Sequence, residues 1–168
     1  MDLSRFEIRP ILPDDKMMMI NGFARLSTES IRQRFFSHKK EFTETELKFL
    51  TEVDQLNHIA FVAIDMQESP PSLAGVIRSI KNLERPLFAE IGIIIGDPYQ
   101  GMGLGTKLFN KIAEEALLAG ISHFYGDYHT SNTKLIRLLE KFAKNRGPLS
   151  IKHKGGGFIY FEAPLKNC

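Results

Sequence analysis

The spacing of apolar residues changes partway through residues 90–120. Residues 91–95 form an apolar, β-branched run interrupted only by Gly92, which is typical of a buried strand. Beyond Gly103 the apolar residues recur at intervals of about 3.6, the period of a helix with one buried face. That face carries Leu104, Leu108, Ile112 and Ala116. Gly120 ends the pattern, so the stretch predicts a strand, a glycine-rich turn and a helix.

Apolar runs of strand length recur along the rest of the chain. Strands are predicted at residues 5–12, 59–64, 73–81, 88–95, 121–128, 150–154 and 158–163. Residues 66–72 and 82–86 hold turn-forming residues, so the three strands that they separate should form an antiparallel meander. Three successive glycines at residues 155–157 suit a hairpin turn between the last two strands.

Several helices are marked by their first residues. Ser27 suits the cap of an early helix, and Thr43 with Glu46 forms a capping box for the next one. Ser131 or Asn132 can cap the last helix. These signals place the helices that the apolar spacing alone leaves without clear boundaries.

The order of these elements narrows the fold class. It reads strand, two or three helices, three strands, the central helix, strand, helix and two strands. Because a crossover helix joins the strands on either side of it, those two strands should be parallel neighbours. We therefore predict an α/β (α+β) fold with a mixed, mostly antiparallel sheet of about seven strands flanked by helices.

Length and composition restrict the number of domains, the class of partner and the cellular location that we expect. A length of 168 residues suits one domain, which we place at residues 1–168. The net charge is only +2, from 22 basic and 20 acidic residues, so no nucleic acid partner is expected. No apolar run approaches membrane-spanning length, and the first residues do not resemble a signal peptide. A single cysteine, Cys168, excludes a disulfide framework. We expect a cytoplasmic protein with no membrane partner.

The turn before the central helix carries the clearest candidate chemistry. Gly101, Gly103 and Gly105 alternate with other residues, and glycine lets a backbone approach a ligand closely. The helix N-terminus behind them favours an anion, so a phosphate-binding loop is the functional interpretation. The structural interpretation is a tight turn between strand and helix that uses glycine without binding a ligand. Neither G-x-x-x-x-G-K-[ST] nor G-x-G-x-x-G fits, since Met102 replaces the lysine of the former.

The pattern that does fit is Q/R-x-x-G-x-G/A, supplied by Gln100, Gly103 and Gly105. With an apolar strand before it and an amphipathic helix after it, the motif resembles that of the GNAT superfamily of acyl-CoA-dependent N-acyltransferases. The element order of that family matches nearly the whole chain. The early segments IRPILPDD and ARLSTESIRQRFFS resemble the acetyltransferase domain of bacterial protein lysine acetyltransferases.

The resemblance implies acetyl-CoA as cosubstrate and a binding site for it. In the family this loop wraps the pyrophosphate, and the preceding strand offers backbone groups to the pantetheine arm. The implied cofactor-binding residues are Ile93, Ile95, Gln100, Gly101, Met102, Gly103, Leu104, Gly105, Thr106 and Asn132. Asn132 equally suits a plain helix cap. The histidines are scattered, so no metal is expected.

Acyl transfer to an amine needs a group that takes the proton of the amine. Glu90 opens the apolar strand and shares a face with Gly92 and Ile94. Burial there would make its carboxylate a better proton acceptor. Some GNAT enzymes place their base on this strand, so we hypothesise that Glu90 is the catalytic base. The alternative is an exposed glutamate, or one paired with Arg78 or Lys81.

The remaining groups of the reaction are less clearly marked. A backbone N–H at Ile93 or nearby would stabilise the oxyanion. Many family members carry a tyrosine midway along the last helix, where residues 137–139 are here Arg, Leu and Leu. Tyr125, Tyr128 and Tyr160 are substitutes only in principle, and the thiolate can leave unassisted.

Several cations have no assigned role at this stage. We interpret Arg32 and Arg34 as solvated charges. The same interpretation applies to the cations of the last helix, which are Lys134, Arg137, Lys141, Lys144 and Arg146.

The acceptor is the least defined part of the prediction. The resemblance favours a primary amine, and among amines a protein lysine. The hairpin at residues 150–163 departs from the short ending usual in the family, and it helps to shape the acceptor groove. A small-molecule amine therefore stays open, as do a non-catalytic acyl-CoA sensor and a purely structural domain. A homodimer is also left open.

Overall fold

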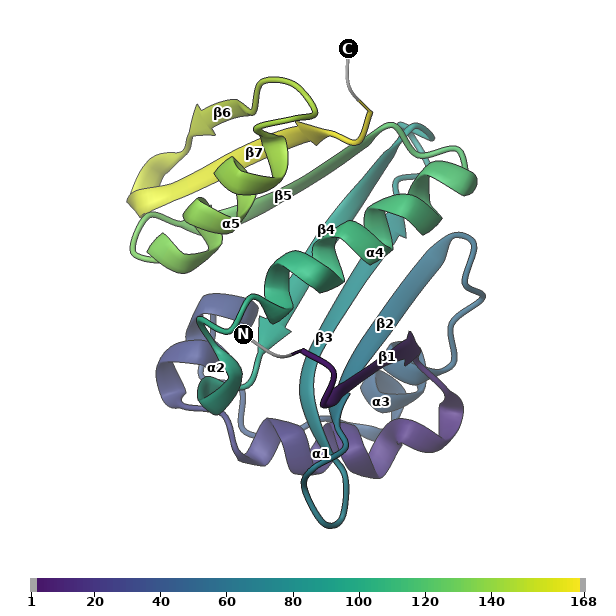
Figure 1. Cartoon of the computed structure of the whole chain (residues 1–168). Helices are drawn as coiled ribbons and strands as arrows, with labels where there is room; N and C mark the ends of the chain where they lie inside the picture. The colour runs from purple at the N-terminus through teal and green to yellow at the C-terminus, as the bar shows by residue number, and fades with distance from the viewer. Residues whose placement is uncertain (1–2, 167–168) are drawn as a thin grey trace.

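A seven-stranded sheet forms the centre of the fold in the computed structural model, which describes residues 3–166 (Figure 1). The strands are β1 (Phe6–Pro10), β2 (His58–Asp65), β3 (Ser72–Lys81), β4 (Phe88–Ile95), β5 (His123–His129), β6 (Ser150–His153) and β7 (Phe158–Pro164). The helices are α1 (Lys16–Ala24), α2 (Thr28–Phe35), α3 (Glu44–Thr51), α4 (Leu104–Leu118) and α5 (Thr133–Ala143). Cys168 lies outside the described residues.

The strand order is β1-β2-β3-β4-β5-β7-β6. Among the described strands only β4 and β5 pair in parallel, and they are the strands that α4 connects. The other neighbouring strands pair antiparallel. The mixed, mostly antiparallel sheet and the parallel pair on either side of the central helix are therefore confirmed.

The helix caps predicted from the sequence are present. The side chain of Ser27 accepts a hydrogen bond from the backbone N–H of Ser30 at the start of α2. Thr43 and Glu46 form both bonds of a capping box at the start of α3. Asn132, rather than Ser131, caps α5.

The start of β5 differs slightly from the prediction. The strand begins at His123, because Ile121 still donates its backbone N–H to the carbonyl of Ala116 in α4, at 2.9 Å. Gly120 allows this tight helix ending with a φ of +81°.

Two hydrophobic clusters lie on opposite faces of the sheet. The larger one packs α4 and α5 against one face, and the apolar stripe of α4 is fully buried there. The smaller one packs α1 and α3 against the other face, with Met19, Leu47 and Ile94 among its members. Alternate residues of β4 point to opposite faces, so this strand takes part in both clusters.

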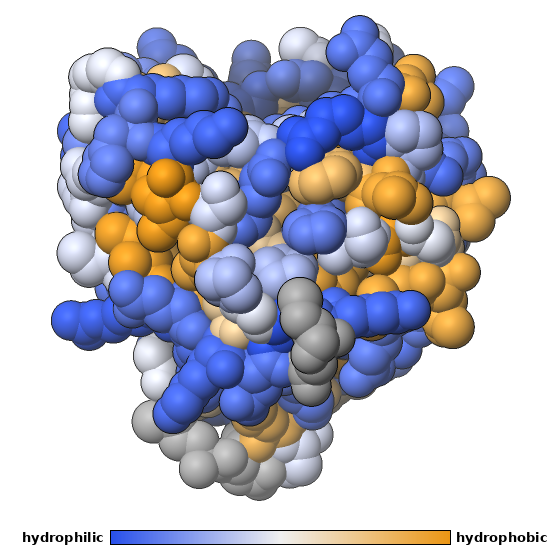
Figure 2. Space-filling view, turned by 90° about the horizontal axis from the view of Figure 1, so that it is seen from above, coloured by the Kyte–Doolittle hydropathy of each residue, from blue (hydrophilic) through white to orange (hydrophobic). Residues whose placement is uncertain are grey.

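The outer surface mixes polar and apolar side chains. Seen from the top of Figure 1, apolar residues form patches that polar residues separate (Figure 2). Among the described residues, no helix is long and apolar enough to cross a membrane.

Candidate active site

The sheet opens between β4 and β5. These two strands pair only where Phe88–Glu90 meets His123–Tyr125. β4 then continues to Ile95 along β3, while β5 diverges from it (Figure 1). Because alternate backbone groups of a strand point to its open side, residues 91–95 offer N–H and C=O groups to a ligand.

A cavity of about 550 Å³ is lined by this open stretch of β4. Its other walls come from the glycine-rich turn, the start of α4, α5 and α2. A volume of this size suits a ligand of cofactor or drug size. The cavity therefore brings the strand edge and the predicted phosphate loop into one site.

Two structural requirements explain the glycines of the glycine-rich turn. Gly101 and Gly103 have φ values of +77° and +87°, a region that side chains disfavour. A Cβ on Gly105 would lie 3.3 Å from Leu138 of α5, so its glycine permits close helix packing. α4 has no side-chain cap at its N-terminus. Its first N–H groups therefore remain for water or an anion.

Gln100 holds the turn in place through its side chain. Its Nε2 donates to the carbonyl of Ile95 at 3.0 Å and to the hydroxyl of Ser30 at 3.2 Å. Its Oε1 accepts a hydrogen bond from Lys134 of α5. Gln100 thus links the turn to β4, α2 and α5, and its carbonyl and amide groups are both engaged within the protein.

Glu90 lies at the point where β4 and β5 separate. It is opposite Tyr125 in the parallel register, and it borders the cavity. Of the two environments considered for Glu90, a buried carboxylate and an exposed one, the structure has the exposed one. The expected alternative pairing is also missing among the described residues, since Arg78 and Lys81 form no ion pair with it.

Comparison with known proteins identifies the family. A family profile described as the acetyltransferase (GNAT) family matches residues 24–143. The chain belongs to this family. Acetyltransferase Pat of Mycolicibacterium smegmatis is 29% identical to it over 136 residues, which are 81% of this chain and 40% of that protein. The chain thus spans less than half the length of this relative.

Two solved GNAT structures show how closely the fold is shared. The GNAT domain of S. lividans PAT has a TM-score of 0.80 at 21% identity, over 94% of this chain and 89% of that one. Spermidine N-acetyltransferase from Vibrio cholerae, solved with CoA and spermine, has a TM-score of 0.71 at 18% identity, over 96% of each chain. At these identities the likeness concerns the fold alone.

Most of the residues that the GNAT resemblance implies for acetyl-CoA border the cavity. These are Ile93, Ile95, Gln100, Gly101, Gly103, Gly105, Thr106 and Asn132. Met102 and Leu104 do not, because Leu104 is fully buried in the core and Met102 packs against it. Only the backbone groups of Leu104 are therefore left for a ligand. Asn132 caps α5, accepting from the N–H of Leu135 at 3.1 Å.

Three cations of α5 lie at the cavity, where the sequence had not predicted them. Lys134, Arg137 and Lys141 are exposed, as expected, yet all three border it. Their spacing of three and four residues places them on one face of the helix, which is a signal that the sequence contains. They bring positive charge to the side of the cavity next to the glycine-rich turn.

Arg34 was also missed. Arg34 was interpreted as a solvated charge, but it is only partly exposed and borders the cavity. Its guanidinium lies across Gly92, where a Cβ would be 2.5 Å from Nη2. Burial lowers the pKa of Arg34, and the carboxylate of Glu90 acts in the opposite direction. Asp127 adds an exposed carboxylate to the cavity wall.

The three candidate tyrosines are not among the residues that border the cavity. Tyr125 accepts a hydrogen bond from Asn82 at 3.0 Å, and Tyr160 donates one to Glu162 at 2.7 Å. Tyr128 is buried in the core. Within residues 3–166, no group of three or more histidine, cysteine, aspartate or glutamate side chains is placed to hold a metal ion.

Proposed function

We propose that this GNAT family member is an N-acetyltransferase, which moves the acetyl group of acetyl-CoA to a primary amine in a ternary complex. The observation that carries the proposal is the cavity at the β4–β5 opening. It connects an uncapped helix N-terminus at one end to the exposed carboxylate of Glu90 at the other. The family membership makes acetyl transfer the reaction to test first.

The cavity offers a separate set of groups to each part of acetyl-CoA. The N–H groups at the start of α4 would bind its pyrophosphate, because helix N-termini favour anions. Lys134, Arg137 and Lys141 would add charge-assisted contacts to its phosphates. The open edge of β4, including Ile93 and Ile95, would bind the amides of its pantetheine arm.

Glu90 is the base in the proposed reaction. The amine nitrogen attacks the thioester carbonyl carbon, so that a C–N bond forms and the C–S bond breaks. The proton lost by the amine passes to the Glu90 carboxylate, and CoA leaves as a thiolate. A backbone N–H of β4, at Ile93 or nearby, would stabilise the oxyanion in between.

A protein lysine is the acceptor that we propose, on the resemblance of the segments before β2 to protein lysine acetyltransferases. A small amine is the enzymatic alternative, and the spermidine N-acetyltransferase with this fold has a small polyamine substrate.

We also propose that residues 1–168 act as one acetyltransferase domain. In support, β1, β6 and β7 lie outside the matched residues 24–143 but complete the same sheet. A cytoplasmic location, where acetyl-CoA is available, stays a prediction.

The proposal predicts acceptor-dependent release of free CoA from acetyl-CoA. Binding of acetyl-CoA is first established by calorimetry, and release is then measured with lysine-containing proteins and small amines. Glu90→Gln should lower turnover at saturating substrate by about 100-fold or more, since it removes the base. Glu84→Gln is the matched control, because Glu84 is exposed in the loop before β4 and away from the cavity.

Two results would overturn parts of this proposal. Full turnover in Glu90→Gln would reject Glu90 as base. Tight binding of acetyl-CoA without release for any acceptor would favour a non-catalytic sensor instead.

A further inference from the structure

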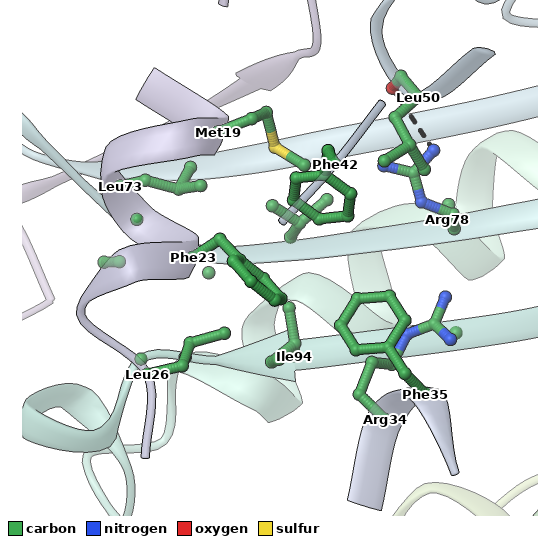
Figure 3. A pocket seen from close by; sticks show the side chains of 16 residues that line it. Met19, Phe23, Leu26, Arg34, Phe35, Phe42, Leu50, Leu73, Arg78 and Ile94 are labelled. Atoms are coloured by element: carbon green, nitrogen blue, oxygen red, sulfur yellow. Dashed lines mark hydrogen bonds between the residues drawn. The ribbon is translucent and has the colours of Figure 1, made fainter. Parts of the chain in front are cut away.

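A second, smaller cavity lies beside the first, between the sheet and helices α1–α3. Its volume is about 60 Å³, and most of its walls are apolar side chains from α1, α3, β3 and β4. Two arginines, Arg34 and Arg78, also border it (Figure 3). Arg34, Gly92 and Ile94 border both cavities, so the two spaces meet at the open edge of β4. We refer to the smaller one as the arginine pocket.

The arginine pocket holds two positive charges that form no ion pair with a described residue. Arg78 is 4% exposed. Burial, and then the charge of Arg34, lowers the pKa of Arg78. A buried charge without a partner is costly, and two like charges add to that cost.

The hydrogen bonds of Arg78 leave part of its guanidinium free. Nη1 donates to the carbonyl of Leu50 at 3.2 Å (Figure 3). It also lies 3.0 Å from Nε2 of His58. No hydrogen bond to Nε or Nη2 of Arg78, or to the guanidinium of Arg34, is present among the described residues. Because every fully buried side-chain polar atom among the described residues has a partner, these free N–H groups keep some accessible surface, and both arginines border the pocket.

A purely structural role explains only part of this arrangement. Arg78 ties the end of α3 to β3 through the Leu50 carbonyl, and that needs one of its five donors. Arg34 is attracted to Glu90 across the open edge of β4, but no ion pair joins them. The remaining donors of both guanidinium groups match the planar, two-oxygen geometry of a carboxylate.

We propose that the arginine pocket binds a carboxylate carried by the amine acceptor. This inference rests on the proposed function, because it takes Glu90 as the place where the amine reacts. Glu90 and Gly92 lie on the same face of β4, two residues apart, which corresponds to about 6.6 Å. An amine at Glu90 and a carboxylate at Arg34 can therefore belong to one amino acid or a short peptide.

The size of the pocket supports a small anionic group rather than a whole ligand. One water molecule needs roughly 10–15 Å³ of such space, so about 60 Å³ admits a carboxylate with its first methylene groups. The apolar walls, which include Phe23 and Phe35, exclude most of the water that would otherwise solvate the anion. Electrostatic attraction between guanidinium and carboxylate is stronger in such surroundings.

The first test compares acceptors that differ only in the carboxylate. Release of CoA is measured with L-lysine against cadaverine, and with lysine–glutamate against lysine–glutamine, both dipeptides amidated at the C-terminus. We expect kcat/KM to be about 10- to 100-fold higher for the carboxylate-bearing member of a pair. Arg34→Met should remove that preference and Arg34→Lys should restore part of it. Arg32→Met, an exposed arginine paired with Glu29 on the same helix, should keep it.

A further arm identifies which substrate carries the carboxylate. Transfer from succinyl-CoA is compared with transfer from butyryl-CoA, which has the same chain length without the second carboxylate. Equal use of the two, together with preference for carboxylate-bearing acceptors, supports the proposal. A preference for succinyl-CoA that Arg34→Met removes would overturn the assignment to the acceptor.

A binding measurement tests the pocket even if no acceptor is turned over. Acetate, a minimal carboxylate, is titrated into the wild-type protein while the arginine Nε–H resonances are followed by NMR. Acetate should shift the resonances of Arg34 and Arg78, assigned with the variants, and neutral acetamide should not. Unchanged resonances with acetate would overturn the carboxylate site while leaving the proposed acetyl transfer standing.

Discussion

At the residue scale, three glycines near the cavity are required for different reasons. Gly103 adopts a left-handed backbone conformation, Gly105 permits close packing against Leu138, and Gly92 makes room for the guanidinium of Arg34. The spacing of the glycine motif predicted the turn. It could not reveal the role of Gly92, because that role depends on a side chain 58 positions away in the sequence.

Gly103→Ala is expected to weaken acetyl-CoA binding. A Cβ at this position meets no other atom, but the φ of +87° costs a residue with a side chain about 1–2 kcal/mol. Relief of that strain would move the turn at the start of α4, so affinity measured by calorimetry should fall by about 10-fold.

Gly120→Ala is the matched control for Gly103→Ala. Gly120 has a φ of +81° and equally open surroundings, but it lies at the other end of α4. It should lower the melting temperature to a similar degree without changing affinity. An equal loss of affinity in both variants would contradict a specific role of the turn.

At the element scale, α2 is joined to the glycine-rich turn. Asp97 accepts hydrogen bonds from the N–H of Ser27 at 2.9 Å, from its hydroxyl at 2.8 Å and from the hydroxyl of Ser30 at 2.9 Å. The sequence predicted Ser27 as the cap of α2. It did not predict the partner, because Asp97 lies 70 positions further along the chain. Through this junction the turn positions Arg34.

Asp97→Ala should therefore affect both stability and binding. Loss of these hydrogen bonds should lower the free energy of unfolding by about 1–3 kcal/mol and release α2 from the turn, which weakens acetyl-CoA binding. Thr43→Ala provides the comparison, since loss of the capping box of α3 costs about 1 kcal/mol away from the cavity. Urea unfolding and calorimetry on both variants separate the two effects. Unchanged affinity in Asp97→Ala would show that α2 and the turn are independent.

At the scale of the whole molecule, the local sequence pattern predicted which helices and strands form. It predicted less well which side chains lie around them. The strand order along the chain and the parallel pair follow from apolar periodicity and crossover geometry, and both are confirmed. Whether Glu90 is buried or exposed was left open, because the point at which β4 and β5 separate depends on pairing across the sheet. The arginine pocket was missed for the same reason, since Arg34 and Arg78 are brought together by the packing of α2 on β4, next to β3.

The charge of Arg78 also makes the stability of the protein depend on pH, through its neighbour His58. Burial, and then the positive charge of Arg78, lower the pKa of His58 to about 4, from an ordinary value of 6.5. As the pH falls, the unfolded chain binds a proton at this histidine before the folded protein does. The folded state is therefore destabilised progressively between about pH 6.5 and pH 4, and this contribution is fully present above that window.

His58→Gln should reduce this loss of stability, because glutamine does not titrate. Allowing for the partial solvent exposure of His58, we expect the fall in unfolding free energy between pH 7 and pH 4.5 to be smaller by on the order of 1 kcal/mol. Urea unfolding at the two pH values measures it, and the comparison cancels the carboxylates that titrate in both proteins. His153→Gln, an exposed histidine on β6, should behave as the wild type. An identical fall in His58→Gln and wild type would mean that His58 accepts its proton without cost, and hence that the charge of Arg78 is already compensated in the folded protein.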